Sequence, residues 1–428
     1  MTAPKEAQKI IDDVLRVADE LGKDPRSLPR SDYIQHGMYG YSYNRIGSWN
    51  VVRRLCAQES GQQPTDRDPA ASQGASQRVN YTARIERRLG RGEWFADRLD
   101  SCLARAIAAN PILLSKHAKP ASLRKSAPAN ATLTCVLSDL HFGMSVDPVE
   151  TLGSHYSPEI ACRRLALVME QCAEWKPEKR DLTDLVIVLG GDIIEGEIHF
   201  EDYLIDPLAA QIDTALRALV SGIDFVRAHY RSVRVIGVPG NHGRSVARNP
   251  SRAMSQKWNS HERSIYLGIE MAFRGMPDVT VEIPRSTIAH YMTPGNHLVA
   301  VTHGDTEPTT ANPGKGINTA RLGEKLRAID ASRCLPAPID VIVQGHWHQP
   351  CWFMTPHGAW SVTNGSLIGG SPFAASGAGV LDPEPAQLLF ESVPGFPLGD
   401  ARAVMVRRAD QRSDLSEIVP TPPHWRSA

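Results

Sequence analysis

Residues 185–197 read LVIVLGGDIIEGE, an apolar run that stops at two glycines and an aspartate. Consecutive apolar positions, three of them β-branched, are typical of a strand buried on both faces of an α/β sheet. Gly190 and Gly191 allow a tight turn at the end of that strand. Asp192 is therefore predicted to project from the carboxyl end of a central strand, where α/β proteins place functional side chains.

The same construction, an apolar strand followed by Asp, Asn or His, occurs at four other places. These are residues 132–143 with Asp139 and His141, residues 233–244 with Asn241 and His242, residues 298–305 with His303, and residues 339–349 with His346 and His348. One such segment alone is more often a capped loop or a packed histidine. Five in one chain bring oxygen and nitrogen donors to one edge of a sheet, which predicts a metal site there.

In order, spacing and strand context, these residues resemble the signature of the calcineurin-like metallophosphoesterases over roughly residues 132–370. The matching motifs are Asp139-Leu140-His141, Gly191-Asp192-Ile193-Ile194-Glu195, Gly240-Asn241-His242, His303 and Gly345-His346-Trp347-His348. Gly243 is a departure, because many relatives carry an acidic residue after the Asn-His pair. The sequence from Asn241 to Arg244 resembles phage- and prophage-encoded members related to double-strand-break repair nucleases.

The resemblance implies a site for two divalent ions. Asp139, His141, Asp192 and His348 would hold one ion, and Asp192, Asn241, His303 and His346 the other, with Asp192 shared. A hydroxide shared by ions about 3.5–4 Å apart has a lowered pKa and can attack a clamped phosphate in line. Mixed oxygen and nitrogen donors suit Mn, Mg, Fe, Zn or Ni, and the resemblance to nucleases favours Mn.

Three residues beside the predicted ligands have roles in this hypothesis. His242 would donate a proton to the leaving oxygen or stabilise charge on the phosphoryl group. Arg244 would contact phosphate with two hydrogen bonds, although a surface salt bridge is an equally good interpretation of it. Asp305 would orient His303 from behind.

Composition and charge describe an ordinary soluble protein of 428 residues with 42% hydrophobic residues. Residues 1–128 hold 21 Lys and Arg against 14 Asp and Glu, a charge of +7, and the remainder holds 26 against 33, a charge of −7. A basic N-terminal part on an acidic body is typical of a nucleic-acid-facing appendage. The seven cysteines show no framework spacing, and no signal peptide or apolar run of spanning length is found. We therefore expect a cytoplasmic protein with reduced thiols and no membrane contact.

The N-terminal region is predicted to be helical. Residues 6–21 carry apolar side chains at helical spacing, and residues 21–55 resemble the homing-endonuclease-associated repeat, a small DNA-binding module with a helix-turn-helix-like fold. The candidate phosphate contacts are Lys23, Arg26, Arg30, Arg45, Arg53 and Arg54. The alternative is a helical cap that only packs on the catalytic body and turns its basic residues to solvent.

The sequence thus predicts five parts. Residues 1–57 form the all-α module, 58–78 a flexible linker, 79–130 a helical connector with a basic end, 131–400 the catalytic domain and 401–428 a polar tail. Helical stretches at residues 158–175 and 207–230 are long enough to cross between neighbouring strands. The catalytic domain is predicted to be a four-layer α/β/β/α sandwich, whose second sheet is implied mainly by the resemblance.

The leading functional hypothesis is a metal-dependent phosphodiesterase that cuts DNA. A phosphomonoesterase or protein phosphatase with an N-terminal docking arm is the alternative, and a scaffold that has lost activity is a third. The third is opposed by competent residues at all seven ligand positions. The resemblance also implies a homodimer, while the sequence does not decide whether an ATPase acts as a partner.

Overall fold

The structure is a computed structural model that describes residues 5–22, 56, 130–149, 151, 154–175, 182–197, 204–244, 260–305, 318–370 and 383–421. The chain divides into two compact units, Met1–Phe95 and Ala96–Ala428. Within these described residues, no helix is both long and apolar enough to cross a membrane.

In the first unit, α1 (Lys5–Glu20) confirms the helix expected from the apolar spacing at residues 6–21. Its buried face carries Ile11, Val14, Val17 and Ala18. The Cys56 thiol lies 3.9 Å from the Ile11 carbonyl oxygen, so Cys56 packs against this helix. The six basic residues proposed to contact DNA, and the second and third predicted helices, lie outside the described residues.

The second unit is built on a six-stranded sheet in the order β13-β12-β1-β3-β5-β6. Its strands are β1 (Ala131–Leu137), β3 (Leu182–Leu189), β5 (Ser232–Gly237), β6 (Val279–Glu282), β12 (Ala386–Ser392) and β13 (Ala401–Met405). Strands β1, β3, β5 and β6 pair in parallel, whereas β12 and β13 are antiparallel to their neighbours. The carboxyl ends of β1, β3 and β5 therefore meet at one edge.

A second sheet has the order β10-β11-β9-β8-β7. Its strands are β7 (Ile288–Thr293), β8 (His297–Thr302), β9 (Val341–Gln344), β10 (Cys351–Met354) and β11 (Trp360–Thr363). Strands β8 and β9 run in parallel, so the two histidine segments that follow them also leave the sheet at one edge. A short pair, β2 (Met144–Ser145) and β4 (Leu204–Ile205), forms a separate ribbon.

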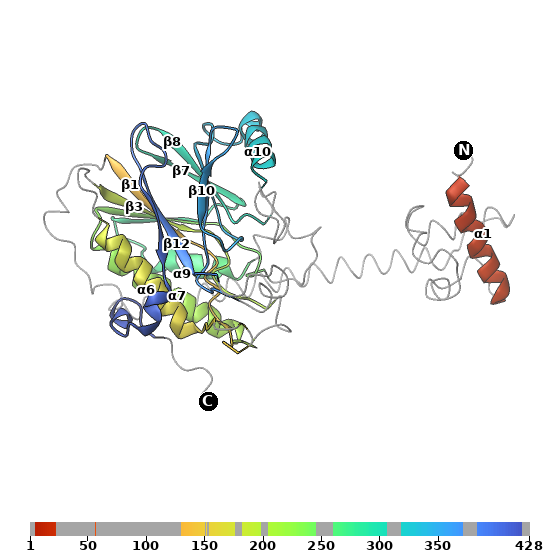
Figure 1. Ribbon diagram of the computed structural model, residues 1–428, viewed down its shortest axis with the longest axis horizontal. Helices are drawn as coiled ribbons and strands as arrows, with labels where there is room; N and C mark the ends of the chain where they lie inside the picture. The colour runs from red at the N-terminus through yellow and green to blue at the C-terminus, as the bar shows by residue number, and fades with distance from the viewer. Residues whose placement is uncertain are drawn as a thin grey trace. The chain divides into compact units, whose positions relative to one another are not determined.

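Helices cover both outer faces of the two sheets, which confirms the predicted four layers. Figure 1 shows α6 (Pro158–Glu174), α7 (Leu208–Arg227) and α9 (Glu262–Ala272) gathered on one side and α10 (Thr319–Ser332) on the other. One apolar core lies between the first sheet and its three helices, a second lies between the sheets, and a third lies under α10. The helices predicted at residues 158–175 and 207–230 are α6 and α7.

The predicted polar tail beginning at residue 401 needs correction. Strand β13 extends the six-stranded sheet, and two short 3₁₀ helices, η4 (Arg407–Gln411) and η5 (Asp414–Glu417), follow it. Val406, Ala409 and Leu415 are buried in the core beside α6. The second unit therefore continues past residue 400. The apolar run here, residues 403–406, is short and followed by a mostly polar stretch, so the local sequence did not distinguish a strand from a tail.

Arg164 ties this C-terminal segment to the body of the domain. Its buried guanidinium contacts the Asp410 carboxylate through two nitrogens, at 2.6 and 2.8 Å. It also donates to the main-chain carbonyls of Leu367 and Ile368. The Leu367 N–H in turn donates to the Asp139 carbonyl, so the same arginine supports a loop beside the predicted metal site.

We predict that Arg164→Met lowers the free energy of unfolding by about 3 kcal/mol, because Asp410 and two carbonyls lose a buried partner. Arg217→Met is the matched control: Arg217 is exposed on α7 and pairs with Asp213 at 2.8 Å, so its loss should cost less than about 0.5 kcal/mol. Urea unfolding followed by tryptophan fluorescence measures both. Equal losses of unfolding free energy in the two variants would show that the buried Arg164 contributes no more to stability than an exposed ion pair.

Candidate metal centre

The five strand ends predicted to carry ligands converge in an interlocked set of loops. The Asp139 N–H donates to the Gly191 carbonyl at 2.9 Å, and the His141 N–H donates to the Asp192 carbonyl at 3.0 Å. Five of the seven predicted ligands have left-handed backbones, with φ of 55° at Asp139, 47° at His141, 52° at Asp192, 70° at His346 and 56° at His348. Such a backbone costs about 1–2 kcal/mol per non-glycine residue and is concentrated at functional sites.

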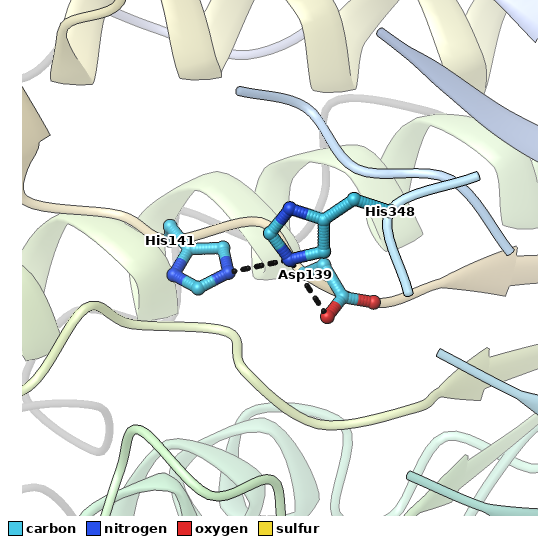
Figure 2. A group of neighbouring side chains, drawn as sticks. All are labelled: Asp139, His141 and His348. Atoms are coloured by element: carbon cyan, nitrogen blue, oxygen red, sulfur yellow. Dashed lines mark hydrogen bonds and ion pairs between the residues drawn. The ribbon is translucent and has the colours of Figure 1, made fainter. Parts of the chain in front are cut away.

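Asp139, His141 and His348 form the first cluster of donor atoms (Figure 2). The Nε2 atom of His348 lies 3.3 Å from Nε2 of His141 and 3.3 Å from Oδ1 of Asp139. Burial raises the pKa of Asp139, but the contact with His348 and the charge of His303 outweigh it, so the net pKa is lowered. Asp139 is therefore an ionised carboxylate, the form that ligates a cation.

Asp192, His303 and His346 form the second cluster. Nε2 of His303 lies 3.0 Å from Oδ2 of Asp192 and 3.0 Å from Oδ1 of Asn241, so Asn241 belongs to the same group. Burial lowers the pKa of His346 to about 4, with the charge of His303 adding to the effect. His346 is therefore neutral near pH 7, as a ligand must be. The structure thus brings the seven predicted ligands into two neighbouring clusters.

The orientation of the imidazoles fits metal ligation. Nδ1 of His141 lies 2.6 Å from a Glu195 carboxylate oxygen, and Nδ1 of His303 lies 2.8 Å from the Gly190 carbonyl oxygen. These contacts require a proton on Nδ1 and leave Nε2 pointing into the clusters. The separation of 3.3 Å between Nε2 of His141 and Nε2 of His348 also fits. Two imidazoles on one tetrahedral ion, with bonds of about 2.0–2.1 Å, require nearly the same distance.

His303 carries a proton where a ligand would need a lone pair. Burial lowers its pKa, but the adjacent Asp192 carboxylate more than offsets this and raises the pKa to about 9. The added proton is shared with the oxygens of Asp192 and Asn241, in the position a cation would take. Binding of a cation there would displace this proton, as expected when metal and proton compete for one site.

Glu195 supplies a carboxylate to two histidines at once. One oxygen contacts His141, and the other lies 3.2 Å from Nδ1 of His242, which also lies 3.2 Å from the Glu195 carbonyl oxygen. Burial lowers the pKa of His242, but the charges of Glu195 and Asp192 dominate and raise it to about 10. These two histidines hold the pKa of Glu195 well below its usual range, although burial opposes this. His242 is thus held protonated beside the clusters.

The sequence motif contained Glu195, but sequence reasoning assigned it no role. Its position three residues after Asp192, together with the glycine at position 243, was the available signal. The structure places the Glu195 carboxylate beside His242. Many relatives have an acidic residue at the position of Gly243, so Glu195 provides His242 with a carboxylate from a different segment.

Arg244 and Asp305 stand at the border of the site. The Nε atom of Arg244 is buried without a hydrogen-bond partner, and no ion pair of Arg244 occurs within the described part of the chain. The salt-bridge interpretation of Arg244 thus finds no support among those residues. Both ring nitrogens of His303 have neighbours other than Asp305. The charge of Asp305 adds to the raised pKa of His303 and partly opposes the lowered pKa of His346. Its orienting role stays a prediction.

A buried polar network behind Asp139 was not found from the sequence. The Ser138 hydroxyl donates to Asp139 Oδ2 at 2.5 Å and accepts from the Asn364 amide at 3.0 Å. The Gln387 side chain accepts from the Ser138 N–H at 3.1 Å and returns a hydrogen bond to the Ser138 carbonyl at 3.1 Å. Ser138, Asn364 and Gln387 are all fully buried. Asn364 and Gln387 hold Ser138, and through it Asp139, from strands that are distant in sequence, so no local pattern marks them.

Comparisons with known proteins give a likeness of fold only. No family model matches the sequence, and no curated protein matches it. Among solved structures, Vps29 from Entamoeba histolytica in complex with zinc has 14% identity and a TM-score of 0.27, covering 64% of this chain and 97% of that chain. A dimetal phosphatase from Danio rerio has 11% identity and a TM-score of 0.32, with coverages of 64% and 99%. A predicted phosphoesterase from Streptococcus pneumoniae has 12% identity and a TM-score of 0.24, with coverages of 64% and 97%. Likeness at this level does not indicate what this chain acts on.

We predict that Asp192→Ala abolishes saturable binding of Mn²⁺, because Asp192 lies among the donors of the second cluster and its charge acts on the first. Asp184→Ala is the control on the same strand: Asp184 pairs with Arg231 at 2.6 Å, and the altered protein should bind Mn²⁺ as before. Calorimetric titration of chelator-treated protein with MnCl₂ measures both. Unchanged Mn²⁺ binding by Asp192→Ala would remove the basis of the site assignment.

Proposed function

We propose that this chain is a two-metal phosphoesterase that hydrolyses phosphodiester bonds in DNA. The observation that carries the proposal is the pair of donor clusters, Asp139 with His141 and His348, and Asp192 with His303 and His346, at one edge of two sheets. Oxygen and neutral imidazole donors of this kind bind divalent first-row metals. A protonated histidine beside them supplies the second requirement of phosphoester hydrolysis, an acid for the leaving oxygen.

Two divalent ions held here would lower the pKa of an attacking water and neutralise charge on the phosphate. Asp192 connects the second cluster to His242 through its two oxygens. Oδ2 lies 3.0 Å from His303, and Oδ1 accepts from the His242 N–H at 2.8 Å. The Asp192 carboxylate therefore fixes the position of His242, the proposed acid, relative to the second cluster.

His242 is suited to give a proton to the leaving group. Its Nδ1 faces the carboxylate and the carbonyl of Glu195, so the proton given to the substrate would come from Nε2. Its side chain is 17% exposed, whereas those of Asp192 and His303 are almost completely buried, so a substrate can reach His242. Arg244, two residues later, would bind a phosphate oxygen from the same loop.

The assignment of DNA as substrate comes from charge. Residues 1–128 carry a net charge of +7, and the candidate phosphate contacts lie there. Attraction between a basic surface and the phosphate backbone would hold a DNA chain near the site at low salt. Mn²⁺ is the metal we favour, and a homodimer and a cytoplasmic location belong to the same proposal. An ATPase partner is not part of it.

We expect the Mn²⁺-loaded protein to hydrolyse DNA. The assay compares linear duplex, single-stranded and closed circular DNA with a small phosphomonoester. Cleavage of the circle would define an endonuclease, and release of nucleotides only from linear substrates an exonuclease. Monoester turnover without DNA cleavage would support the alternative, a phosphatase whose N-terminal region is a docking arm.

Asp192→Asn serves as the negative control in this assay. It keeps the size of the side chain and removes the charge that the metal site requires. Activity on any substrate that persists in Asp192→Asn belongs to a contaminant or to a different site, and would contradict the proposal.

We expect His242→Asn to lower kcat by about 10²–10⁴-fold, the usual contribution of a positioned acid, while two Mn²⁺ ions still bind. His290→Asn is the control, since His290 is exposed on β7 and should be neutral in both assays. A substrate with a better leaving group needs less protonation, so the defect should shrink with p-nitrophenyl esters. A defect that is equal for good and poor leaving groups would exclude the role of acid.

A further inference from the structure

Glu262 is a buried carboxylate that the proposed reaction does not use. It is the first residue of α9 and is fully buried. Its Oε1 accepts from the Ile193 N–H at 2.6 Å, and its Oε2 accepts from the Gly240 N–H at 2.7 Å. No cation forms an ion pair with it among the residues that the structure describes. Two main-chain N–H groups are thus its partners.

The two donors flank two of the metal-site residues. Ile193 directly follows Asp192, and Gly240 directly precedes Asn241. The two segments leave neighbouring strands, β3 and β5, and approach each other closely: a Cβ at Gly240 would lie 2.1 Å from Oδ1 of Asp192. A single carboxylate therefore clamps together the loops that carry Asp192 and Asn241.

The loop after Asn241 leaves space for the Glu262 side chain at Gly243. A Cβ at Gly243 would lie 2.6 Å from Cγ of Glu262 and 2.7 Å from the Ser260 hydroxyl. The His261 N–H also donates to the Gly243 carbonyl at 2.7 Å. The glycine at position 243 is thus explained by space, because a side chain from α9 occupies the volume that a side chain at position 243 would need.

Burying the charged carboxylate of Glu262 in this position carries a desolvation cost. Burial raises the pKa of Glu262 to about 7, and the charge of Asp192 adds to this, although both N–H donors oppose it. Two main-chain N–H groups can be satisfied by neutral acceptors at a lower desolvation cost. Cations beside Asp192 would favour the ionised form, so the clamp is strongest when the site is filled.

We propose that Glu262 is a positioning residue of the metal centre, which sets the spacing of Asp192 and Asn241 through the N–H groups of Ile193 and Gly240. The inference rests on the proposed function, since it assigns both residues to a metal site. Glu262 itself contacts neither the ions nor the substrate. It acts through the backbone of two loops, from a helix that contributes no ligand.

The test is Glu262→Gln in the full-length chain. Glutamine keeps the shape, but its amide oxygen can accept from only one of the two N–H groups, and its NH₂ group faces the other. We expect Mn²⁺ affinity to fall by about 10–100-fold, the range for losing a residue that holds a ligand in place. In the electron paramagnetic resonance spectrum, the signal of a coupled Mn²⁺ pair should give way to that of isolated Mn²⁺.

Gly243→Ala is a second variant that leaves the carboxylate intact and displaces it by contact. It should lower Mn²⁺ affinity in the same way, and it keeps the test decisive if Glu262→Gln does not fold. Ile269→Ala is the matched control on the same helix. Ile269 is fully buried in the core between the first sheet and its helices, so its truncation weakens the docking of α9 without removing a hydrogen bond to the segments at Ile193 and Gly240.

The outcomes separate this inference from the proposed function. Loss of Mn²⁺ affinity in Glu262→Gln or Gly243→Ala, but not in Ile269→Ala, at similar losses of thermal stability, supports a positioning role. Unchanged affinity in the folded variants, or an equal loss in Ile269→Ala, would overturn it, since α9 would then act only through general stability. Absence of Mn²⁺ binding in the unaltered protein would overturn the proposed function instead.

Discussion

Two buried carboxylates, Asp139 and Asp192, impose the constraint that the rest of the second unit satisfies. An ionised carboxylate removed from water is costly unless hydrogen bonds and positive charge surround it. Here, the main-chain N–H groups of His346 and His242 donate to Asp139 and Asp192, respectively, and protonated His303 lies between Asp192 and Asn241. Divalent ions would supply the remaining charge. The charges of the two carboxylates are therefore compensated only when the strand ends come together.

That requirement explains why the fold has two sheets. The first sheet supplies Asp139, His141, Asp192 and Asn241, and the second supplies His303, His346 and His348. Neither sheet holds a complete set of donors for either cluster, so packing of the sheets through their shared apolar core is what assembles the site. The left-handed backbone at five ligands is strain that this assembly maintains.

Much of the fold followed from local patterns, because an apolar run and the residue that ends it are neighbours in sequence. The five motif strands and helices α6 and α7 lie where the patterns placed them. Strand β13 and the 3₁₀ helices after it did not follow, since the apolar run there, residues 403–406, is short and a polar stretch follows it. The pairing with β12, and not the local composition, makes this segment part of the sheet.

The sequence by itself selected the candidate metal ligands, because each one closely follows the end of an apolar strand and is marked by the residues just before it. Only the tertiary structure decided what holds them in place. Glu262 reaches Ile193 across 69 residues of chain, and Gln387 reaches Ser138 across 249. Both are polar residues without a local signature, and their roles arise from burial beside main-chain groups of other strands. Such contacts are set by how the layers pack, which no periodicity along the chain records.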